Sequence, residues 1–238
     1  MKLASCIVIL SYSCILLPKP GEMLRILDKE NSIVNQYLYE IRCSSIQKDR
    51  MRFRSNLERL GQVFGYEISK TMKYEKRDVS TPLGNLTIPT PVNWPILTTI
   101  LRAGLPLHEG LLSIFDKHDC GYVSAYRNHS KKDDSFEVEV EYISSPYLEN
   151  RDLILSDTML ATGTSLVKVL KALREYGNPA NIHVVAAISS REGLEYAQEH
   201  FPTKTQFWIG SVDEEMTAKS YIVPGLGDAG DLAFGEKE

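Results

Sequence analysis

The chain has 238 residues, of which 43% are hydrophobic and 24% charged, and a formal net charge of −4 at pH 7. This composition is typical of a globular protein of one domain, or of one domain with an appendage, and a chain of this length can bury a core without disulfides. The acidic balance argues against a general nucleic-acid-binding role, and no stretch is long and apolar enough to span a membrane. The four cysteines show no metal-ligand spacing and predict free thiols in a reducing compartment: Cys6, Cys14, Cys43 and Cys120.

Residues 1–22 form an N-terminal extension that differs in character from the rest of the chain. One lysine, an apolar run broken by Ser11, Tyr12 and Ser13, and a turn rich in Pro and Gly give it the outline of a weak secretory signal, but no small-residue cleavage site follows. The alternative is a mis-called start, with translation beginning at Met23. In either case the remaining residues, 23–238, predict a single domain.

The first predicted element of this domain is an amphipathic helix from Met51 to about Lys73. Its apolar residues recur every three to four positions: Phe53, Leu57, Leu60, Phe64 and Ile68. The basic cluster that opens it is either a solvated face or an arm that faces phosphate or an interface: Lys48, Arg50, Arg52 and Arg54. Residues 80–93 predict a loop, because three prolines and a glycine interrupt them.

Strands and helices alternate from residue 95 onward. Apolar runs predict strands at residues 95–101, 121–127, 135–143, 152–156, 181–189 and 205–212, and helices at 105–115, 165–177 and 191–200. Strict alternation in residues 135–143 indicates a half-exposed antiparallel strand that forms a hairpin with residues 121–127. The other strands, separated by helices, predict a parallel sheet covered on both faces, and an irregular glycine-rich tail follows Val212.

Three unusual segments follow predicted strands, at residues 101–106, 126–130 and 156–165. Ligands of open parallel sheets bind beyond the carboxyl ends of the strands, so these segments are expected to meet there. Small and hydroxyl-bearing residues from Ala161 to Ser165 lead directly into a helix, whose free N–H groups and partial positive charge suit a phosphate. Asp157 would project from the same edge and accept hydrogen bonds from a sugar or help to hold a metal. In the plainer interpretation the hydroxyls cap the helix and Asp157 is a turn residue.

The stretch LILSDTMLATGTS, Leu153–Ser165, resembles the phosphoribosyl pyrophosphate signature of the type I phosphoribosyltransferases. Its second part, DTMLATGTS, is more similar to the uracil phosphoribosyltransferase family, as are ILRAGL at residues 100–105 and YIVPGLGDAGD at residues 221–231. The three motifs stand in the family's order, and the resemblance covers roughly Leu24 to Gly235. Because it begins near Met23, it favours the mis-called start. The departures from the pattern, at Ser156, Thr158 and Thr164, remove no ligand group.

The resemblance implies the type I phosphoribosyltransferase fold, an open parallel α/β sheet with flanking helices, an antiparallel flap hairpin and an irregular C-terminal hood that binds the base. It implies a pentosyltransferase that converts uracil and 5-phosphoribosyl 1-pyrophosphate into UMP and pyrophosphate. Mg²⁺ would be the cofactor, held mainly through the pyrophosphate of the substrate and not by dedicated protein ligands. A cytoplasmic homo-oligomer is also implied, and GTP is a candidate allosteric effector because some family members respond to it.

Residue roles follow from the same resemblance. The catalytic residues would be Arg102, Asp157 and Asp228. Phosphoribosyl pyrophosphate would be bound by Arg102, Arg127, Asp157, Thr158, Met159, Leu160, Ala161, Thr162, Gly163, Thr164, Ser165 and Asp228. Uracil would contact Ile222, Gly227, Asp228 and Ala229, largely through main-chain groups. Arg102 and Arg127 stand at strand ends, where a forked donor holds pyrophosphate or forms a structural ion pair.

Three alternatives stand beside this function: an RNA-binding pyrimidine regulator with the same fold, a purine-type phosphoribosyltransferase, and a catalytically silent relative. The segment YIVPGLGDAGD argues against the first two, since a regulator would carry a vestigial uracil segment and a broad basic face. Intact Arg102, Asp157 and Asp228 argue against the third. The histidines are interpreted as structural, except His129, which lies beside Arg127.

Overall fold

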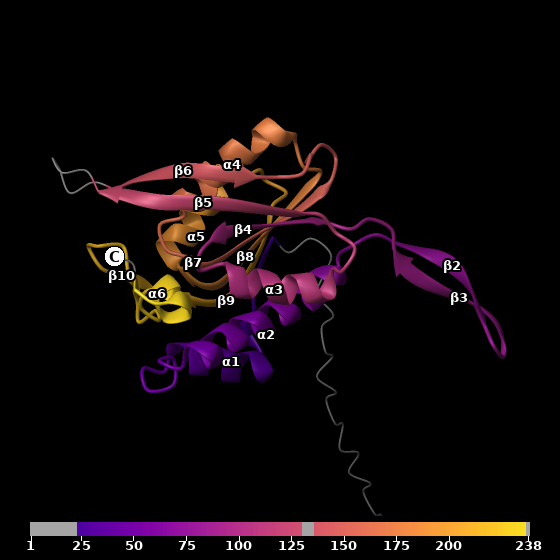
Figure 1. Ribbon diagram of the computed structural model, residues 1–238, viewed down its shortest axis with the longest axis horizontal. Helices are drawn as coiled ribbons and strands as arrows, with labels where there is room; N and C mark the ends of the chain where they lie inside the picture. Colours follow the sequence, from indigo (N-terminus) through magenta and orange to yellow (C-terminus); the bar gives the residue numbers. More distant parts are fainter. Residues whose placement is uncertain (1–22, 130–135, 237–238) are drawn as a thin grey trace, which may run out of the picture.

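The computed structural model describes residues 23–129 and 136–236, and the side chains of residues 126–129 and 136–138 are outside this description. A seven-stranded sheet in the order β1-β9-β8-β7-β4-β5-β6 forms its centre (Figure 1). All neighbouring strands in it are parallel except the edge pair β5 and β6, which is antiparallel. The strands are β1 (Leu24–Ile26), β4 (Ile96–Leu101), β5 (Cys120–His129), β6 (Phe136–Ser144), β7 (Asp152–Leu160), β8 (Asn181–Ser190) and β9 (Gln206–Asp213).

Helices cover both faces of the sheet (Figure 1). One face carries α1 (Ile33–Arg42), α2 (Arg50–Ser69) and α3 (Leu105–Ile114), and the other carries α4 (Thr164–Leu173) and α5 (Arg191–His200). The 3₁₀ turns Leu27–Lys29 and Arg174–Tyr176 follow β1 and α4. Successive residues of the central strands enter the two cores in turn, because side chains alternate across a strand. Both faces of these strands are therefore apolar, as the uninterrupted hydrophobic runs predict.

The predicted architecture is confirmed: an open, mainly parallel α/β sheet with flanking helices, an antiparallel hairpin at one edge and an irregular C-terminal region. That region contains the short strands β10 (Glu215–Met216) and β11 (Ile222–Val223) and the helix α6 (Ala229–Phe234).

Within the described ranges, Cys43 and Cys120 are free thiols, as predicted. Cys6 and Cys14, and the extension of residues 1–22 that contains them, lie outside the described residues. In the same ranges, no helix combines the length and the apolar character needed to cross a bilayer.

The prediction of a loop at residues 80–93 is wrong. The chain there belongs to an antiparallel hairpin of β2 (Tyr74–Thr81) and β3 (Gly84–Pro91), which projects from the body of the molecule (Figure 1). Almost all of its side chains are exposed. The sequence therefore lacks the alternation of apolar and polar residues that predicts a half-buried strand. Pro89 and Pro91 are tolerated because each strand of a two-stranded ribbon has an open edge that needs no donor.

The helix α1 was not predicted, and β7 extends beyond its predicted end. A capping box begins α1, in which the Val34 amide donates to Ser32 Oγ (3.3 Å) and the Ser32 amide donates to Asn35 Oδ1 (2.8 Å). The helix α2 ends at Ser69 and not near Lys73. The strand β7 continues past residue 156 to Leu160, so Asp157 lies within the strand and not directly after it.

Two buried histidines fit the structural interpretation. His183 Nδ1 accepts a hydrogen bond from Trp208 Nε1 (3.1 Å), and His108 packs edge-on against Tyr122. Burial lowers the pKa of each imidazole from 6.5 to about 4, with a smaller contribution from His118 in the case of His108. Both side chains are therefore neutral in the folded protein at pH 7. The side chain of His129 lies outside the described residues.

These lowered pKa values predict acid sensitivity. The unfolded chain binds protons at these histidines below about pH 6.5 and the folded chain does not, so stability present above pH 6.5 is lost as the pH falls toward 4. Between pH 7.5 and pH 5 each histidine should remove about 2 kcal/mol from the free energy of unfolding. Urea unfolding of wild type and of His108→Leu at the two pH values checks this. The variant should lose less stability than wild type, and equal losses would contradict the assignment.

Candidate active site

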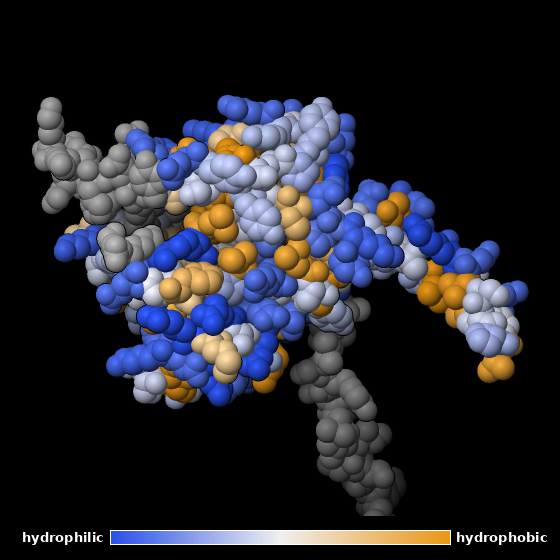
Figure 2. Space-filling view, in the orientation of Figure 1, coloured by the Kyte–Doolittle hydropathy of each residue, from blue (hydrophilic) through white to orange (hydrophobic). Residues whose placement is uncertain are grey.

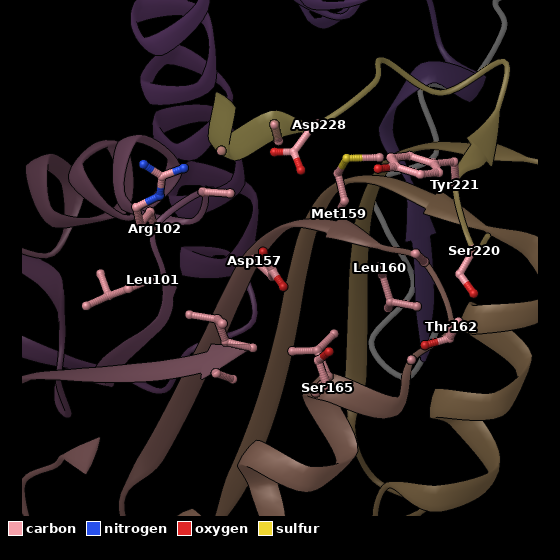
Figure 3. A pocket seen from close by; sticks show the side chains of 18 of the residues that line it. Leu101, Arg102, Asp157, Met159, Leu160, Thr162, Ser165, Ser220, Tyr221 and Asp228 are labelled. Atoms are coloured by element: carbon pink, nitrogen blue, oxygen red, sulfur yellow. The ribbon is translucent and has the colours of Figure 1, made fainter. Parts of the chain in front are cut away.

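The carboxyl edge of the sheet and the C-terminal segments surround a cavity of about 750 Å³ (Figure 3). Its lining comes from residues 100–103, 157, 159–163, 165–166, 219–221 and 227–230, with Ala125 of β5. The predicted segments 101–106 and 156–165 therefore meet at one edge of the sheet, and the C-terminal segment joins them. Figure 3 shows Arg102 and Asp228 on one side of the cavity, Thr162 and Ser165 on the opposite side, and Asp157 between them. The volume is that of a small-molecule site.

A tight loop between β7 and α4 forms one wall of the cavity. Gly163, the N-cap of α4, has a φ of +74°, a left-handed conformation that favours glycine. A Cβ added to Gly163 would lie 2.6 Å from the carbonyl oxygen of Gly193. Thr162, Gly163 and Ser165 all line the cavity, so the N-terminus of α4 opens onto it. This arrangement of free amides and hydroxyls at a helix N-terminus is suited to a phosphate group.

The turn from β8 into α5 supports this loop from behind. Ser190 Oγ donates to the carbonyl oxygen of Ala161 (2.5 Å) and accepts from the Gly193 amide (2.8 Å). A Cβ at Gly193 would lie only 1.8 Å from the Ala161 oxygen, so no larger residue fits between the two turns. These supporting residues were not predicted from the sequence, because Ser190 lies 29 residues along the chain from the Ala161 oxygen that it binds.

Asp157 and Thr158 point in different directions from β7. Asp157 is half-buried and lines the cavity, and its Oδ1 accepts from the Thr158 amide (2.7 Å). Thr158 is fully buried, and its Oγ1 donates to the carbonyl oxygen of Ala103 (2.6 Å). The threonine thus ties β7 to the turn after β4 and does not line the cavity.

Arg102 follows β4 and joins the cavity to the C-terminal helix. Its Nη2 donates to Asp231 Oδ1 (3.2 Å) and to the carbonyl oxygen of Gly235 (3.3 Å). Its Nε is buried and has no hydrogen-bond partner among the described residues. Arg102 therefore forms a structural ion pair and also lines the cavity. Its role toward pyrophosphate stays a prediction.

The C-terminal segment supplies the remaining wall. Asp228 Oδ1 accepts from the Asp231 amide (3.0 Å) and caps α6, and Gly227, Asp228 and Ala229 line the cavity. Gly227 has a φ of +93°, and a Cβ there would meet no atom within 4 Å. The main chain of this segment is therefore accessible from the cavity.

Some predicted site residues do not line the cavity. Ile222 is buried in β11, Thr164 is the first residue of α4, and Thr158 contacts Ala103, as described above. Arg127 pairs with Val138 between β5 and β6, and its side chain lies outside the described residues. The other predicted site residues all line the cavity: Arg102, Asp157, Met159, Leu160, Ala161, Thr162, Gly163, Ser165, Gly227, Asp228 and Ala229.

The cavity also has lining residues that were not predicted. Lys219 and Ser220 lie in the turn between β10 and β11, where Ser220 has a φ of +61°. Tyr221 belongs to the quoted C-terminal motif but was given no role. A single lysine in an irregular segment carries no periodic signal, so the sequence alone could not place it. The others come from the elements beside the predicted motifs: Ile100, Leu101, Ala103, Ala125, Leu166 and Gly230.

The basic cluster at the start of α2 is divided between two surroundings. Arg52 pairs with Glu40 of α1, and Arg54 Nη1 donates to the carbonyl oxygen of Ala233 in α6 (2.7 Å). Lys48 and Arg50 line a smaller cavity of about 330 Å³ on the other side of the C-terminal segment. Lys48, Arg50 and Arg52 are exposed, as the solvated-face interpretation predicts, and Arg54 packs α2 against the C-terminal region. None of the four is a wall of the main cavity.

The carboxylates of the cavity suit a metal that arrives with a ligand. Asp157 and Asp228 both line it, and oxygen donors are the ones that Mg²⁺ prefers. Across residues 23–129 and 136–236, no three His, Cys, Asp or Glu side chains are grouped as metal ligands.

Comparison with known proteins identifies the family. The model of the uracil phosphoribosyltransferase family matches residues 29–236. The chain belongs to this family. It is 47% identical over 211 residues to the uracil phosphoribosyltransferase of Porphyromonas gingivalis, which covers 89% of this chain and 97% of the relative.

A second uracil phosphoribosyltransferase, from Pyrococcus furiosus, is 40% identical over 205 residues, covering 84% of this chain and 87% of the relative. A solved protein structure from Aquifex aeolicus superimposes with a TM-score of 0.79 at 30% identity, covering 90% of this chain and 98% of that one. The resemblance of the three sequence motifs to the uracil phosphoribosyltransferase family is thus confirmed.

The close approach of two turns at Gly163 predicts a large stability effect. Gly163→Ala would suffer both a left-handed φ, worth about 1–2 kcal/mol, and a clash with Gly193, worth about 1–3 kcal/mol more. Gly227→Ala is the matched control, since its φ is also positive and its Cβ would meet no atom within 4 Å. Urea unfolding should show the larger loss of free energy for Gly163→Ala. Equal losses would mean that the approach to Gly193 is not tight.

Proposed function

We propose that the chain transfers the 5-phosphoribosyl group of phosphoribosyl pyrophosphate to uracil, which yields UMP and pyrophosphate. The observation that carries this proposal is one cavity lined by a hydroxyl-bearing loop at a helix N-terminus, a carboxylate, an arginine and a glycine-rich segment. These are the groups required by a phosphate, a ribose, a pyrophosphate and a flat base, respectively. The relatives named uracil phosphoribosyltransferase support the same reaction.

The proposed placement of phosphoribosyl pyrophosphate follows the order of the lining. The 5-phosphate lies on the loop from Ala161 to Ser165, and the ribose hydroxyls donate to Asp157. The pyrophosphate lies toward Arg102, which lines the cavity, and toward Arg127 in the last part of β5. Met159 and Leu160 contribute the wall between the loop and the base.

The chemistry demands charge stabilisation and alignment more than a strong acid or base. Cleavage of the bond between C1 and the pyrophosphate develops positive charge on the ribose and negative charge on the leaving group. Asp157 holds the ribose in line and Arg102 neutralises the leaving oxygens. Asp228, at the start of α6, faces the ribosyl substrate from the side of the base. Mg²⁺, when bound with the pyrophosphate, supplies further neutralisation.

The base lies against the C-terminal segment. Uracil offers two carbonyl acceptors and the N3–H donor, since N1 loses its proton and forms the bond to C1 of the ribose. The main chain of Gly227, Asp228 and Ala229 lines the cavity and can form hydrogen bonds with these groups. Ile222, the fourth predicted base contact, is buried outside the lining. Support comes from the positive φ of Gly227 and from the open space where its side chain would be. A pyrimidine regulator or a silent relative is the alternative function, and the convergence of Arg102, Asp157 and Asp228 on one cavity favours the enzyme.

A competition among bases tests the proposed reaction. Cytosine replaces the acceptor at position 4 with a donor and the N3 donor with an acceptor, and each buried mismatch costs about 1–3 kcal/mol. We expect UMP formation from uracil, phosphoribosyl pyrophosphate and Mg²⁺, with cytosine used at least roughly 10³-fold less efficiently. 5-Fluorouracil keeps the hydrogen-bonding edge and should be accepted. Absence of UMP would contradict the function, and cytosine turnover within about tenfold of uracil would contradict main-chain reading of the base.

The proposal includes a homo-oligomer. The β2–β3 hairpin projects into solvent and carries exposed apolar side chains, with Leu83 at 100%, Leu86 at 47% and Ile88 at 39% exposure (Figure 2). A second copy of the chain that covered this hairpin would remove the apolar area from water. Sedimentation velocity should show an oligomer for wild type and a smaller species for Leu83→Ser/Leu86→Ser. A monomeric wild-type protein would contradict this part of the proposal.

A cytoplasmic location and GTP as an effector complete the proposal. Both are supported by family membership, and the free thiols Cys43 and Cys120 agree with a reducing compartment. The effect of GTP is tested by measuring the rate of UMP formation with and without GTP, and an unchanged rate would contradict activation.

A further inference from the structure

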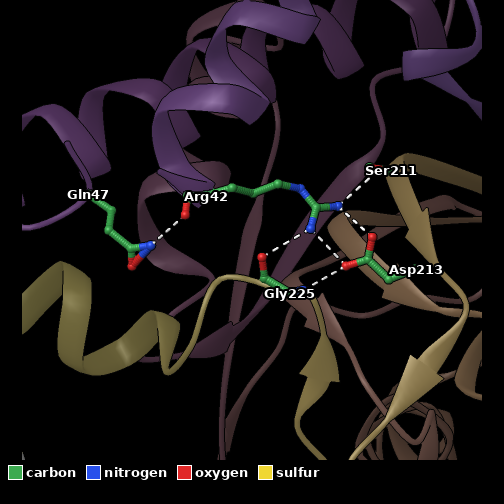
Figure 4. A network of polar contacts seen from close by, with 5 residues as sticks. All are labelled: Arg42, Gln47, Ser211, Asp213 and Gly225. Atoms are coloured by element: carbon green, nitrogen blue, oxygen red, sulfur yellow. Dashed lines mark hydrogen bonds and ion pairs between the residues drawn. The ribbon is translucent and has the colours of Figure 1, made fainter. Parts of the chain in front are cut away.

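A buried ion pair outside the cavity connects three distant parts of the chain (Figure 4). Arg42 is the last residue of α1, and Asp213 is the last residue of β9. Two parallel hydrogen bonds join them, from Nη1 to Oδ2 (2.7 Å) and from Nη2 to Oδ1 (2.9 Å), and Nη2 also donates to Ser211 Oγ (2.9 Å). The side chains are 20% and 8% exposed, so the forked pair is largely desolvated.

The same pair binds both main-chain polar groups of Gly225. Arg42 Nη1 donates to the Gly225 carbonyl oxygen (3.0 Å), and the Gly225 amide donates to Asp213 Oδ2 (2.9 Å). Gly225 has a φ of +55°, and a Cβ there would lie 2.2 Å from the carbonyl oxygen of Ile222. One ion pair thus fixes the two peptide planes on either side of a residue in a strained turn.

This turn leads directly to the proposed base site. Ile222 precedes Gly225 by three residues, and Gly227 follows it by two and lines the main cavity. Neither Arg42 nor Asp213 is among the residues that line that cavity. The ion pair therefore reaches the cavity only through the main chain of residues 222–227.

Stability alone is a weak explanation for such a pair. Moving two charges out of water costs free energy that their attraction barely returns, and well-packed apolar residues of similar volume are often as stabilising. A lysine would not substitute for Arg42, because an ammonium lacks the planar fork that serves Asp213, Ser211 and Gly225 together. An apolar pair would not reproduce the two hydrogen bonds to the main chain of Gly225.

We propose that Arg42 and Asp213 are positioning residues for the base: they hold Gly225 so that the main chain from Gly227 to Ala229, which lines the cavity, presents its hydrogen-bonding groups to uracil. The inference rests on the function proposed above and assigns to the pair a role that no residue of the cavity performs. It separates the two substrates, because the phosphate loop, Asp157 and Arg102 make no hydrogen bond to this pair.

The expected signature is a selective change in KM. A displacement of bound groups by about 1 Å can cost on the order of 10²-fold in reactivity, so loss of the fork should raise the KM for uracil by about tenfold or more. The KM for phosphoribosyl pyrophosphate should stay within about twofold of wild type. A purely structural role would lower the amount of folded enzyme and leave both KM values unchanged.

Three variants and one control test this. Arg42→Lys keeps the charge and removes the fork, and Asp213→Asn keeps the shape and removes the charge. Arg42→Met/Asp213→Leu replaces the pair with apolar side chains and preserves burial. The control is Arg191→Gln, which breaks a forked pair with Glu214, the neighbour of Asp213, on the exposed surface. Arg191 makes no contact with Gly225, so the control should keep wild-type KM values.

The readout is the ratio of the two KM values, measured alongside urea unfolding. A raised ratio of uracil KM to phosphoribosyl pyrophosphate KM in the three pair variants supports the proposal, even where stability also falls. An unchanged ratio in all three variants overturns it, whatever the stability. Gly227→Ala separates failure of this inference from failure of the base placement. If it raises the uracil KM while the pair variants do not, the base site stands and the positioning role is lost; if neither does, the base lies elsewhere.

Discussion

The parallel direction of neighbouring strands is the constraint on which this structure depends. Because β1, β9, β8, β7, β4 and β5 run the same way, their carboxyl ends meet at one edge of the sheet. Helices cover both faces of the sheet (Figure 1), so the segments that follow different strands meet at its carboxyl edge. The cavity of about 750 Å³ is a direct consequence of this topology.

Close contact between main-chain turns then gives the edge its shape. Gly163 and Gly193 let the loop between β7 and α4 lie against the turn that begins α5, and Gly225 lets the C-terminal segment bend against Ile222. Such contacts are rigid because no side chain separates the backbones. The hydrogen bonds of Ser190 hold the loop that lines the cavity, and those of the Arg42–Asp213 pair hold Gly225, two residues before the part of the C-terminal segment that lines it. Preorganised main-chain donors are well suited to a reaction governed by alignment and charge.

Sequence reasoning predicted the central architecture because apolar runs and helix caps are local signals. It also predicted the cavity residues between Asp157 and Ser165, except that Thr158 and Thr164 do not line the cavity, and those from Gly227 to Ala229, since those motifs are continuous in the chain. It failed at the β2–β3 hairpin, whose exposed strands carry no apolar alternation. It also missed Ser190 and Arg42, because their importance comes from contacts with residues 29 and 183 positions away, which no local pattern reports.

The structure of a complex with UMP tests the central claim most directly, because the product carries a phosphate, a ribose and the base in one covalent ligand. A crystal structure should place the phosphate on the loop from Ala161 to Ser165, the ribose hydroxyls at Asp157 and the base against the main chain of Gly227 to Ala229. A phosphate bound at the N-terminus of another helix, or a base that contacts no main-chain group of this segment, would contradict the account.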